Sequence, residues 1–289
     1  MLVTLRDVMQ YAEERCIAIG SFNTPNQESV QAVVGAAEEL GLPVIIQFAQ
    51  CHDPWVPLEV IGPIMLDAAR RASVPVCVHL DHGETLDYLQ RALDLGFTSI
   101  MYDGSTSAYE DNRDNTRRAV ELAAKTGASV EAELGSMGKR ETGAGETDGQ
   151  SDETKIYTDP QWASRFVEET GIDALACSFG TTHGIYLTEP KLDFDVVRQV
   201  RALTGGKVPV VMHGGSGVSK EDYARAIAAG VRKVNYFTYM DKAGGAAVAE
   251  YLSTVQPGAP VFFSAVMEQA RKAMQENAKT AMKLFAGMA

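Results

Sequence analysis

The sequence repeats one unit along most of its length: an amphipathic helix, a glycine, and then a short apolar strand. The five strands of this kind span residues 44–48, 99–102, 129–134, 174–178 and 233–237, and follow Gly41, Gly96, Gly127, Gly171 and Gly230. A glycine just after a helix is typical of a C-terminal cap, where the chain takes a left-handed conformation. The repeat therefore predicts helices alternating with parallel strands.

Three more apolar strands complete the set, at residues 17–22, 75–78 and 209–212. Eight strands, each followed by a helix, over about 250 residues are typical of a closed parallel TIM (β/α)8 barrel. An open doubly wound sheet of eight strands is the alternative. No linker rich in proline, serine or charge interrupts the repeat, so we expect one α/β domain over residues 1–289.

Helix start signals accompany the repeat. Thr4 and Asp7 have capping-box spacing, which predicts an N-terminal helix rather than a signal peptide. The stretch Thr24-Pro25-Asn26-Gln27 also predicts a capping box, with the proline at the first helical position. Asp159-Pro160 and Ser219-Lys220-Glu221-Asp222 are expected to open later helices in the same way.

One segment lacks the repeat. Residues 136–155 have no apolar period and contain four glycines. A loop of this length in a compact barrel is typically a lid or a disordered insertion. Because this segment follows a strand, it leaves the barrel at the C-terminal face, and we expect an active-site lid.

The composition narrows the possible partners. A formal net charge of −12 argues against nucleic acid and anionic membrane surfaces, which both attract basic proteins. The chain has no run of 18 apolar residues, which argues against a membrane span. Its four cysteines form no C-x-x-C pair, which favours free thiols in a reducing cytoplasm. We therefore expect a cytoplasmic protein.

Three of the five histidines follow or end strands of the predicted barrel: His82, His183 and His213. The C-terminal ends of barrel strands converge on one rim, so these three imidazoles can meet around a point. Three neutral imidazoles with an open fourth position are typical of catalytic zinc. The alternative is that each histidine is an ordinary polar residue at a strand end.

Two neighbouring segments predict a phosphate site on the same rim. One is the glycine-rich turn that opens the helix after the seventh strand, formed by Gly214, Gly215, Ser216 and Gly217. The other ends the eighth strand with Asn235, Tyr236, Phe237 and Thr238. Bare N–H groups at a helix start bind phosphate, and this is the usual phosphate position in such barrels.

Zinc beside a phosphate cradle suits a phosphorylated ketone. Zinc can polarise the ketone oxygen and stabilise an enediolate, so that a C–C bond is made or broken without a lysine Schiff base. The reaction also needs a group that exchanges a proton with the aldehyde oxygen, and Asp81 is placed for it beside His82. A mobile base on the lid must take the proton from the ketone carbon.

Five motifs resemble the class II (metal-dependent) fructose/tagatose-bisphosphate aldolase family, in order from about Leu5 to Phe285. They are His79-Leu80-Asp81-His82-Gly83, Val130-Glu131-Ala132-Glu133-Leu134-Gly135, Gly180-Thr181-Thr182-His183-Gly184, His213-Gly214-Gly215-Ser216-Gly217 and Lys233-Val234-Asn235. The resemblance implies Zn²⁺ on His82, His183 and His213, with Asp81 as acid/base at the aldehyde oxygen. A monovalent cation near the phosphate and a homodimer or homotetramer are further expectations.

The resemblance also assigns residues that spacing alone does not. Glu133 matches a glutamate close to the metal in some members. Asn23 and Gly184 match groups that contact the substrate, dihydroxyacetone phosphate. Counting eight residues on from Glu133 puts Glu141 at the position of the lid base, although Lys139-Arg140 replace a more usual glycine-containing run.

Three departures from the family concern the substrate. Ala49 replaces a serine, Phe237 replaces a small or acidic residue, and 256–263 lack the arginine that meets a second phosphate. We therefore expect a metal-dependent aldolase for a ketose 1-phosphate. The alternatives are an ordinary fructose- or tagatose-1,6-bisphosphate aldolase, with Lys139 or Arg140 holding the second phosphate, and a non-catalytic aldolase-like subunit.

Overall fold

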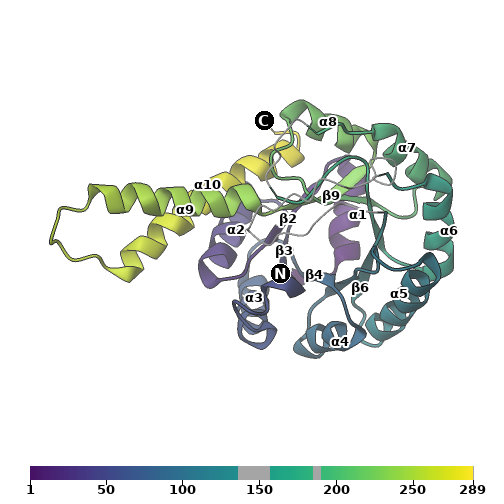
Figure 1. Ribbon diagram of the computed structural model, residues 1–289, viewed down its shortest axis with the longest axis horizontal. Helices are drawn as coiled ribbons and strands as arrows, with labels where there is room; N and C mark the ends of the chain where they lie inside the picture. The colour runs from purple at the N-terminus through teal and green to yellow at the C-terminus, as the bar shows by residue number, and fades with distance from the viewer. Residues whose placement is uncertain (136–156, 185–189, 289) are drawn as a thin grey trace.

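In the computed structural model, which describes residues 1–135, 157–184 and 190–288, eight parallel strands form a barrel surrounded by helices (Figure 1). The strands are β2 (Ile19–Asn23), β3 (Val44–Ala49), β4 (Val76–Gly83), β5 (Ser99–Tyr102), β6 (Ser129–Leu134), β7 (Ala174–Cys177), β8 (Val210–Met212) and β9 (Val231–Tyr236). They pair in the order β4-β3-β2-β9-β8-β7-β6-β5, and β4 also pairs with β5. This last pairing closes the sheet, which confirms the TIM barrel and rules out the open sheet.

The first strand of the chain, β1 (Leu2–Val3), was not predicted from the sequence. It pairs with the start of β4, and α1 (Leu5–Arg15) follows it. The buried face of α1 packs on residues from the lower ends of the barrel strands, in a cluster of Leu5, Val8, Met9, Ala12, Ile19, Ile45, Cys77, Ala174, Ala176 and Val211. This cluster fills the N-terminal end of the barrel, so functional groups are left to the other end.

The remaining helices are α2 (Gln27–Leu40), α3 (Leu58–Arg71), α4 (Leu86–Leu95), α5 (Tyr109–Ala124), α6 (Pro160–Thr170), α7 (Phe194–Leu203), α8 (Lys220–Ala229), α9 (Thr238–Thr254) and α10 (Phe263–Phe285), with a short 3-10 turn η1 (Gln50–His52) after β3. Their buried faces pack against the outward-facing side chains of the strands in one continuous core. In the part of the chain that the structure describes, no helix has both the length and the hydrophobicity to cross a membrane.

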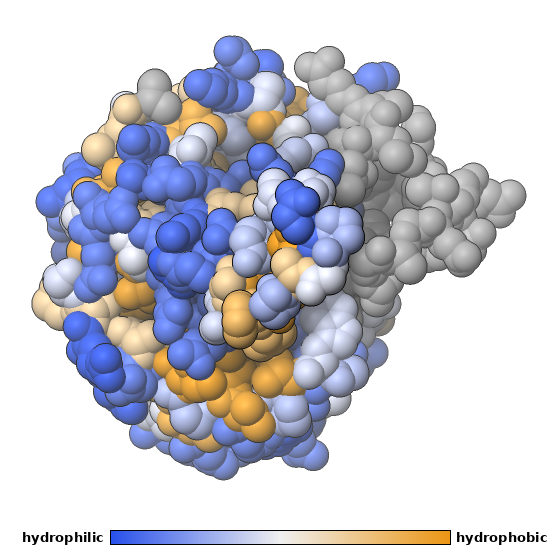
Figure 2. All heavy atoms as spheres, turned by 90° about the vertical axis from the view of Figure 1, so that its left-hand side faces the viewer, coloured by the Kyte–Doolittle hydropathy of each residue, from blue (hydrophilic) through white to orange (hydrophobic). Residues whose placement is uncertain are grey.

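Helices α9 and α10 form an antiparallel hairpin that projects from the barrel (Figure 1). Val261, Phe262 and Phe263, at the tip of the hairpin, are 49%, 64% and 77% exposed. Figure 2 views the molecule from this side and shows hydrophobic surface gathered among polar surface. Exposed apolar side chains that lie together are typical of a protein-binding surface.

The helix starts agree with the sequence except at α2. Thr4 caps α1 in a capping box with Asp7, and Asp159 caps α6 with proline at its first turn. Helix α2 is capped by Asn26, whose side chain accepts a hydrogen bond from the Ser29 amide, so the predicted start at Thr24 is wrong. The physical reason is that the Thr24 amide instead donates to the Gln47 carbonyl of β3 (2.9 Å), which keeps it in the barrel.

The glycines after the helices behave largely as predicted. Gly41, Gly96 and Gly171 are left-handed C-terminal caps. Gly127 has a positive φ of 77° but lies beyond the cap of α5, where Lys125 takes that position instead. The prediction that Gly127 caps its helix is therefore wrong. All four cysteines are free thiols, as expected.

Candidate active site

The end of β4 departs from regular strand geometry. As a result, two adjacent side chains of β4 face the same side of the strand. In a regular strand neighbouring residues point to opposite faces. Here the register with β5 shifts between Leu80 and Gly83, and His82 takes a left-handed conformation with φ of 44°. Such a conformation is uncommon for a residue other than glycine. As a result Asp81 and His82 both line the cavity at the C-terminal end of the barrel.

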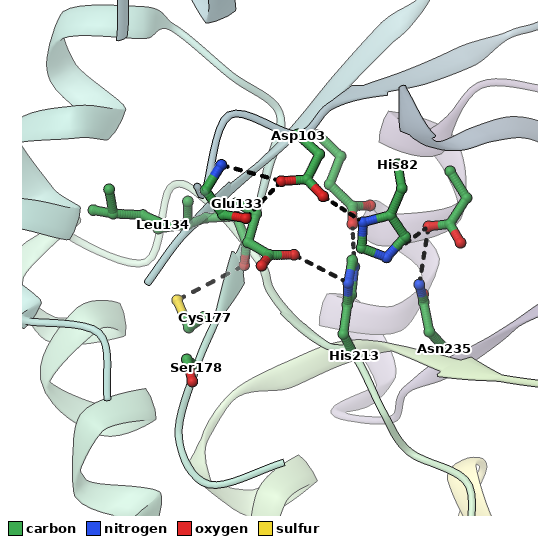
Figure 3. A network of polar contacts seen from close by, with 12 residues as sticks. His82, Asp103, Glu133, Leu134, Cys177, Ser178, His213 and Asn235 are labelled. Carbon is green, nitrogen blue, oxygen red and sulfur yellow. Dashed lines mark hydrogen bonds and ion pairs between the residues drawn. The ribbon is translucent and has the colours of Figure 1, made fainter. Parts of the chain in front are cut away.

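The three predicted histidines come together at this end of the barrel. One nitrogen from each of His82, His183 and His213 lies within 4.8 Å of the others. The ring centroid of His82 lies 5.1 Å from that of His183 and 4.7 Å from that of His213. Figure 3 shows His82 and His213 side by side, with Asp103 and Glu133 next to them. The geometry is that of a candidate metal centre.

Two of these imidazoles are oriented by carboxylates on their outer side. His82 Nδ1 donates to Asp103 (2.7 Å), and His213 Nε2 donates to Glu131 (2.9 Å). Metal-binding histidines are commonly fixed in this way, because the hydrogen bond sets which nitrogen keeps its proton. The arrangement leaves His82 Nε2 and His213 Nδ1 as the nitrogens that can bind a cation.

Buried polar atoms without a hydrogen-bond partner show whether a cation would fit between the histidines. Both ring nitrogens of His183 and Nδ1 of His213 are buried without a hydrogen-bond partner among the described residues. Glu133 Oε2 is also buried and lies 3.3 Å from His213 Nδ1. Buried polar atoms are rarely left unsatisfied, and unpaired atoms converging on one point are explained by an ion held between them.

The electrostatics of the cluster favour a positive charge at the same point. Burial, together with the charges of His82 and His213, lowers the pKa of His183 to about 3, which keeps it neutral as a ligand must be. Burial also opposes protonation of His213, but its hydrogen bond to Glu131 and the nearby Glu133 carboxylate outweigh burial and raise its pKa to about 10. A site that binds an extra proton so strongly is one that a metal cation can occupy in its place.

Asp81 is held by three amides from three other strands. Its carboxylate accepts hydrogen bonds from Gln47 (3.0 Å), Asn23 (3.3 Å) and Asn235 (3.1 Å). Burial opposes ionisation, but the charges of His82, His213 and Lys233 outweigh it and lower the pKa of Asp81 to about 2. Asp81 is therefore an ionised carboxylate held in one orientation.

A second polar layer lies beneath the histidines, inside the barrel. Lys233 Nζ is 2.8 Å from Glu131 Oε2 and donates to Asn235 Oδ1 (2.8 Å). His79 Nδ1 lies 2.8 Å from Ser99 Oγ, and its other nitrogen is 3.6 Å from Glu131. Because Lys233 occupies the Asn235 oxygen, the Asn235 amide N–H₂ is directed to Asp81.

A cavity that is partly open to solvent connects these groups. The described residues that line it are Asn23, Ala49, Cys51, Asp81, His82, Glu84, His183, Gly184, Gly214, Gly215, Ser216, Asn235, Tyr236 and Phe237. Eight of the ten predicted substrate-binding residues are in this set. Gly217 and Thr238 are the exceptions. Glu141 and the predicted lid lie outside the described residues.

The glycine-rich loop differs from the prediction in two respects. It precedes α8 rather than opening it, because Ser219 caps the helix and Lys220 is its first residue. The Gly215 amide is also not bare, since it donates to the Asn235 carbonyl (3.1 Å). The Ser216 and Gly217 amides donate to no backbone acceptor within the described residues. Helix α9 begins beside this loop, and its cap residue Phe237 supplies no side-chain hydrogen bond.

Sequence reasoning missed the residues that orient the site. Glu131 was noted only inside a motif, and Asp103 and Lys233 were not assigned a role. A signal was present for Glu131, because it lies two residues from Glu133 in β6 and so shares its inward face. Asp103 follows the end of β5, where an acidic residue lies on the same rim as the histidines.

A closed parallel barrel with a histidine and carboxylate centre at the C-terminal ends of its strands is the active-site arrangement of a barrel enzyme. The chain belongs to the class II fructose-bisphosphate aldolase family, whose model matches residues 3–288. This membership makes the protein a lyase of the aldolase type, as the sequence resemblance predicted. It also sets aside the non-catalytic alternative.

Similar proteins agree with this assignment. YdjI of Escherichia coli K12 is 37% identical over 285 residues, which are 99% of this chain and 98% of YdjI. The crystal structure of the YdjI aldolase superimposes with a TM-score of 0.86 at 36% identity, covering 99% and 97% of the two chains. A fructose-bisphosphate aldolase of Staphylococcus epidermidis is 37% identical over 257 residues, 87% of this chain and 86% of its own.

Proposed function

We propose that the protein cleaves a ketose 1-phosphate into dihydroxyacetone phosphate and an aldehyde, and forms it in reverse, with Zn²⁺ as cofactor. The observation that carries the proposal is one cavity lined by an oriented carboxylate, by His82 and His183 of the histidine cluster, and by a glycine-rich loop. Retro-aldol assays on a panel of sugar phosphates, with and without chelator, test it. No turnover of any ketose phosphate would contradict it.

The metal would be held by His82, His183 and His213, with Glu133 beside them. The chemistry that a bound zinc ion supplies is Lewis acidity toward a ketone oxygen. The donor set suits zinc, because imidazole and carboxylate are ligands that zinc commonly takes in catalytic sites. A monovalent cation near the phosphate remains a prediction.

Asp81 is proposed to act at the aldehyde half. In the cleavage direction its carboxylate accepts the proton of the hydroxyl that becomes the aldehyde oxygen, as the C–C bond breaks. Its three amide donors hold it in one orientation and favour the ionised form. Glu141 is proposed, from the family resemblance, to exchange the proton at the ketone carbon.

The phosphate is proposed to bind between the loop at Gly214–Gly217 and the start of α9. The loop provides the amides of Ser216 and Gly217, and α9 begins with uncapped N–H groups and the positive end of its dipole. Neutral backbone donors suit an anion in an acidic protein, because they need no added cationic side chain. This placement keeps the predicted loop and adds α9, in place of α8, as the neighbouring helix.

The Gly214→Ala substitution tests the loop. Gly214 has φ of 61°, and a Cβ there would lie 2.3 Å from the Thr182 carbonyl oxygen, so the loop must shift. We expect the KM for dihydroxyacetone phosphate in the condensation direction to rise about tenfold, equivalent to one lost hydrogen bond. Gly41→Ala is the matched control, since φ is 64° and nothing lies within 4 Å. Equal KM values for the two variants would contradict the placement.

The alternative is a fructose- or tagatose-1,6-bisphosphate aldolase, and the names of the similar staphylococcal proteins favour the fructose-bisphosphate enzyme. A second phosphate is best held by an arginine or another charge-assisted clamp. Among the described residues, no lysine or arginine lines the cavity. Lys139 and Arg140, which could serve, lie outside the described residues.

We therefore predict that ketose 1-phosphates with an uncharged far end are better substrates than the two bisphosphates. The measurement is kcat/KM for fructose 1-phosphate against fructose 1,6-bisphosphate and tagatose 1,6-bisphosphate. A clear preference for either bisphosphate would support the alternative. A homodimer or homotetramer is also proposed, with the exposed tip of the α9–α10 hairpin as a candidate contact surface.

A further inference from the structure

Lys233 is a buried cation that the proposed mechanism does not use. Its side chain is fully enclosed in the barrel, and it is not among the described residues that line the cavity. A buried lysine is rare unless it is paired, and here Nζ lies 2.8 Å from Glu131 Oε2. Because Lys233 lies beneath the cavity, any effect that it has on the reaction must pass through a neighbouring side chain.

Strand β9 places Lys233 directly beneath a residue of the active site. Side chains two residues apart in a strand share a face, so Lys233 and Asn235 both point into the barrel. Lys233 Nζ donates to Asn235 Oδ1 (2.8 Å), and the Asn235 amide N–H₂ donates to Asp81 Oδ1 (3.1 Å). A continuous chain of hydrogen bonds therefore runs from the buried cation through Asn235 to the carboxylate.

The two oxygens of the Asp81 carboxylate are held differently. Asn23 and Gln47 both donate to Oδ2. Gln47 also donates to the Asn23 oxygen and accepts a hydrogen bond from Ser21, so these two donors are oriented by each other and by a hydroxyl. Among the described residues, Oδ1 accepts its hydrogen bond from Asn235. The orientation of the carboxylate at Oδ1 thus depends on which end of the Asn235 amide faces it.

Lys233 decides which end that is. An asparagine side chain has a donor end and an acceptor end of nearly the same shape, so it can turn over at little steric cost. A lysine ammonium has donors and no acceptor, and the Asn235 oxygen must therefore face Lys233. Without Lys233, the amide is free to turn and to place its oxygen against Oδ1 of Asp81, where two acceptors repel each other.

We infer that Lys233 is a positioning residue for cleavage of the C–C bond, because it keeps the donor end of Asn235 on the Asp81 carboxylate. The inference rests on the proposed function and deepens it, since it assigns the buried lysine to the aldehyde half of the reaction. Proton exchange at the ketone carbon does not use Asp81 in that proposal. Loss of Lys233 should therefore impair cleavage and spare proton exchange, whereas loss of a purely structural residue would affect both.

The test replaces Lys233 with methionine, which is also a long side chain but has no donor. Two rates are measured in the zinc-loaded full-length enzyme. One is kcat for cleavage of fructose 1-phosphate, or of fructose 1,6-bisphosphate if the wild type prefers it, and the other is solvent-hydrogen exchange into dihydroxyacetone phosphate. In Lys233→Met the ratio of cleavage to exchange should fall about tenfold, the effect of one lost hydrogen bond. The KM of the ketose phosphate and the bound zinc per chain should stay close to the wild type.

A double variant tests the route from Lys233 to Asp81. Two residues that act through one group have non-additive effects when both are replaced. Adding Lys233→Met to Asp81→Ala should therefore change the cleavage rate by no more than about twofold, since the carboxylate that Lys233 positions is already absent. A further loss of about tenfold would show that Lys233 acts by another route and would contradict the inference.

Arg232→Met is the matched control. Arg232 is the preceding residue of β9 and another buried cation, and it pairs with Glu13 (2.8 Å). Its other donors reach the carbonyls of Ile227 and Val231, so among the described residues it has no hydrogen bond that leads to Asp81. Arg232→Met should lower the Tm and leave the ratio of cleavage to exchange unchanged.

The Glu131→Gln/Lys233→Met double variant removes both charges of the buried pair, and it repeats the test at saturating Zn²⁺ if Lys233→Met does not fold. If the wild type cleaves and the ratio is the same in the Lys233 variants as in Arg232→Met, the inference is overturned and the proposed function stands. Loss of bound zinc in Lys233→Met would also overturn it, because the lysine would then act on the metal site. If the wild type cleaves no ketose phosphate, both are overturned.

Discussion

Replacement of Asp81 with alanine is expected to lower the rate of ketose 1-phosphate cleavage by about 10²-fold or more, the usual scale for loss of a general acid or base. Exchange of the proton at the ketone carbon of dihydroxyacetone phosphate should fall much less, because Asp81 is proposed to act at the aldehyde oxygen. The two rates are measured separately, as retro-aldol turnover and as solvent-hydrogen exchange.

The contacts of Asp81 make an isosteric variant informative. Its carboxylate accepts hydrogen bonds from Asn23, Gln47 and Asn235, so Asp81→Asn keeps the shape but places an amide among amides. Asparagine cannot accept the proton, and cleavage should fall as in Asp81→Ala. A variant at this position that kept cleavage within a few-fold of the wild type would exclude the proposed role.

Glu141→Ala is expected to show the opposite bias, because Glu141 is proposed to act at the ketone carbon. In Glu141→Ala, proton exchange at the ketone carbon should fall more than cleavage does. Equal losses of both reactions in both variants would show that the two roles are wrongly assigned.

The barrel could be predicted because its signals are local and repeated. Strands β5 and β6 begin and end at the predicted residues, since each is a short run that closely follows the glycine of its repeat unit. The start of α2 was not predictable in the same way. The Thr24 amide donates to Gln47 of β3, and only the folded barrel supplies that partner. Tertiary hydrogen bonding thus overrode a valid local capping pattern.

The site was predictable in composition but not in arrangement. Strand ends that converge on one rim explain why three distant histidines meet. The spacing of Asp81 and His82 alone would place them on opposite faces, and only the positive φ of His82 brings them to one cavity. The roles of Glu131 and Lys233 depend on side chains that meet inside the barrel, a contact between strands that no sequence period records.

Chelation of the metal is expected to abolish cleavage, and added Zn²⁺ is expected to restore it. We expect this because nitrogens of three imidazoles lie within 4.8 Å of one another, and because His183 and His213 have buried nitrogens without a hydrogen-bond partner among the described residues. His82→Ala should lose metal, measured as bound zinc per chain. It should remain folded, because the site lies at the C-terminal end while α1 and its cluster fill the other end of the barrel.

The decisive measurement is the change in thermal stability of the folded protein when zinc binds, rather than its activity. A ligand that binds only the folded state stabilises it by RT ln(1 + [L]/Kd), so Zn²⁺ at about 100 times its Kd should add about 2.7 kcal/mol and raise the Tm of the wild type. His82→Ala should lack this rise. His52→Ala is the control, because His52 is a buried histidine outside the metal cluster, stacked on Trp55. The His52→Ala variant should lose packing and start from a lower Tm than the wild type. Its Tm should nevertheless still rise when Zn²⁺ is added. An equal rise in His82→Ala and the wild type would place the metal elsewhere, and full turnover of the chelated enzyme would refute the zinc proposal.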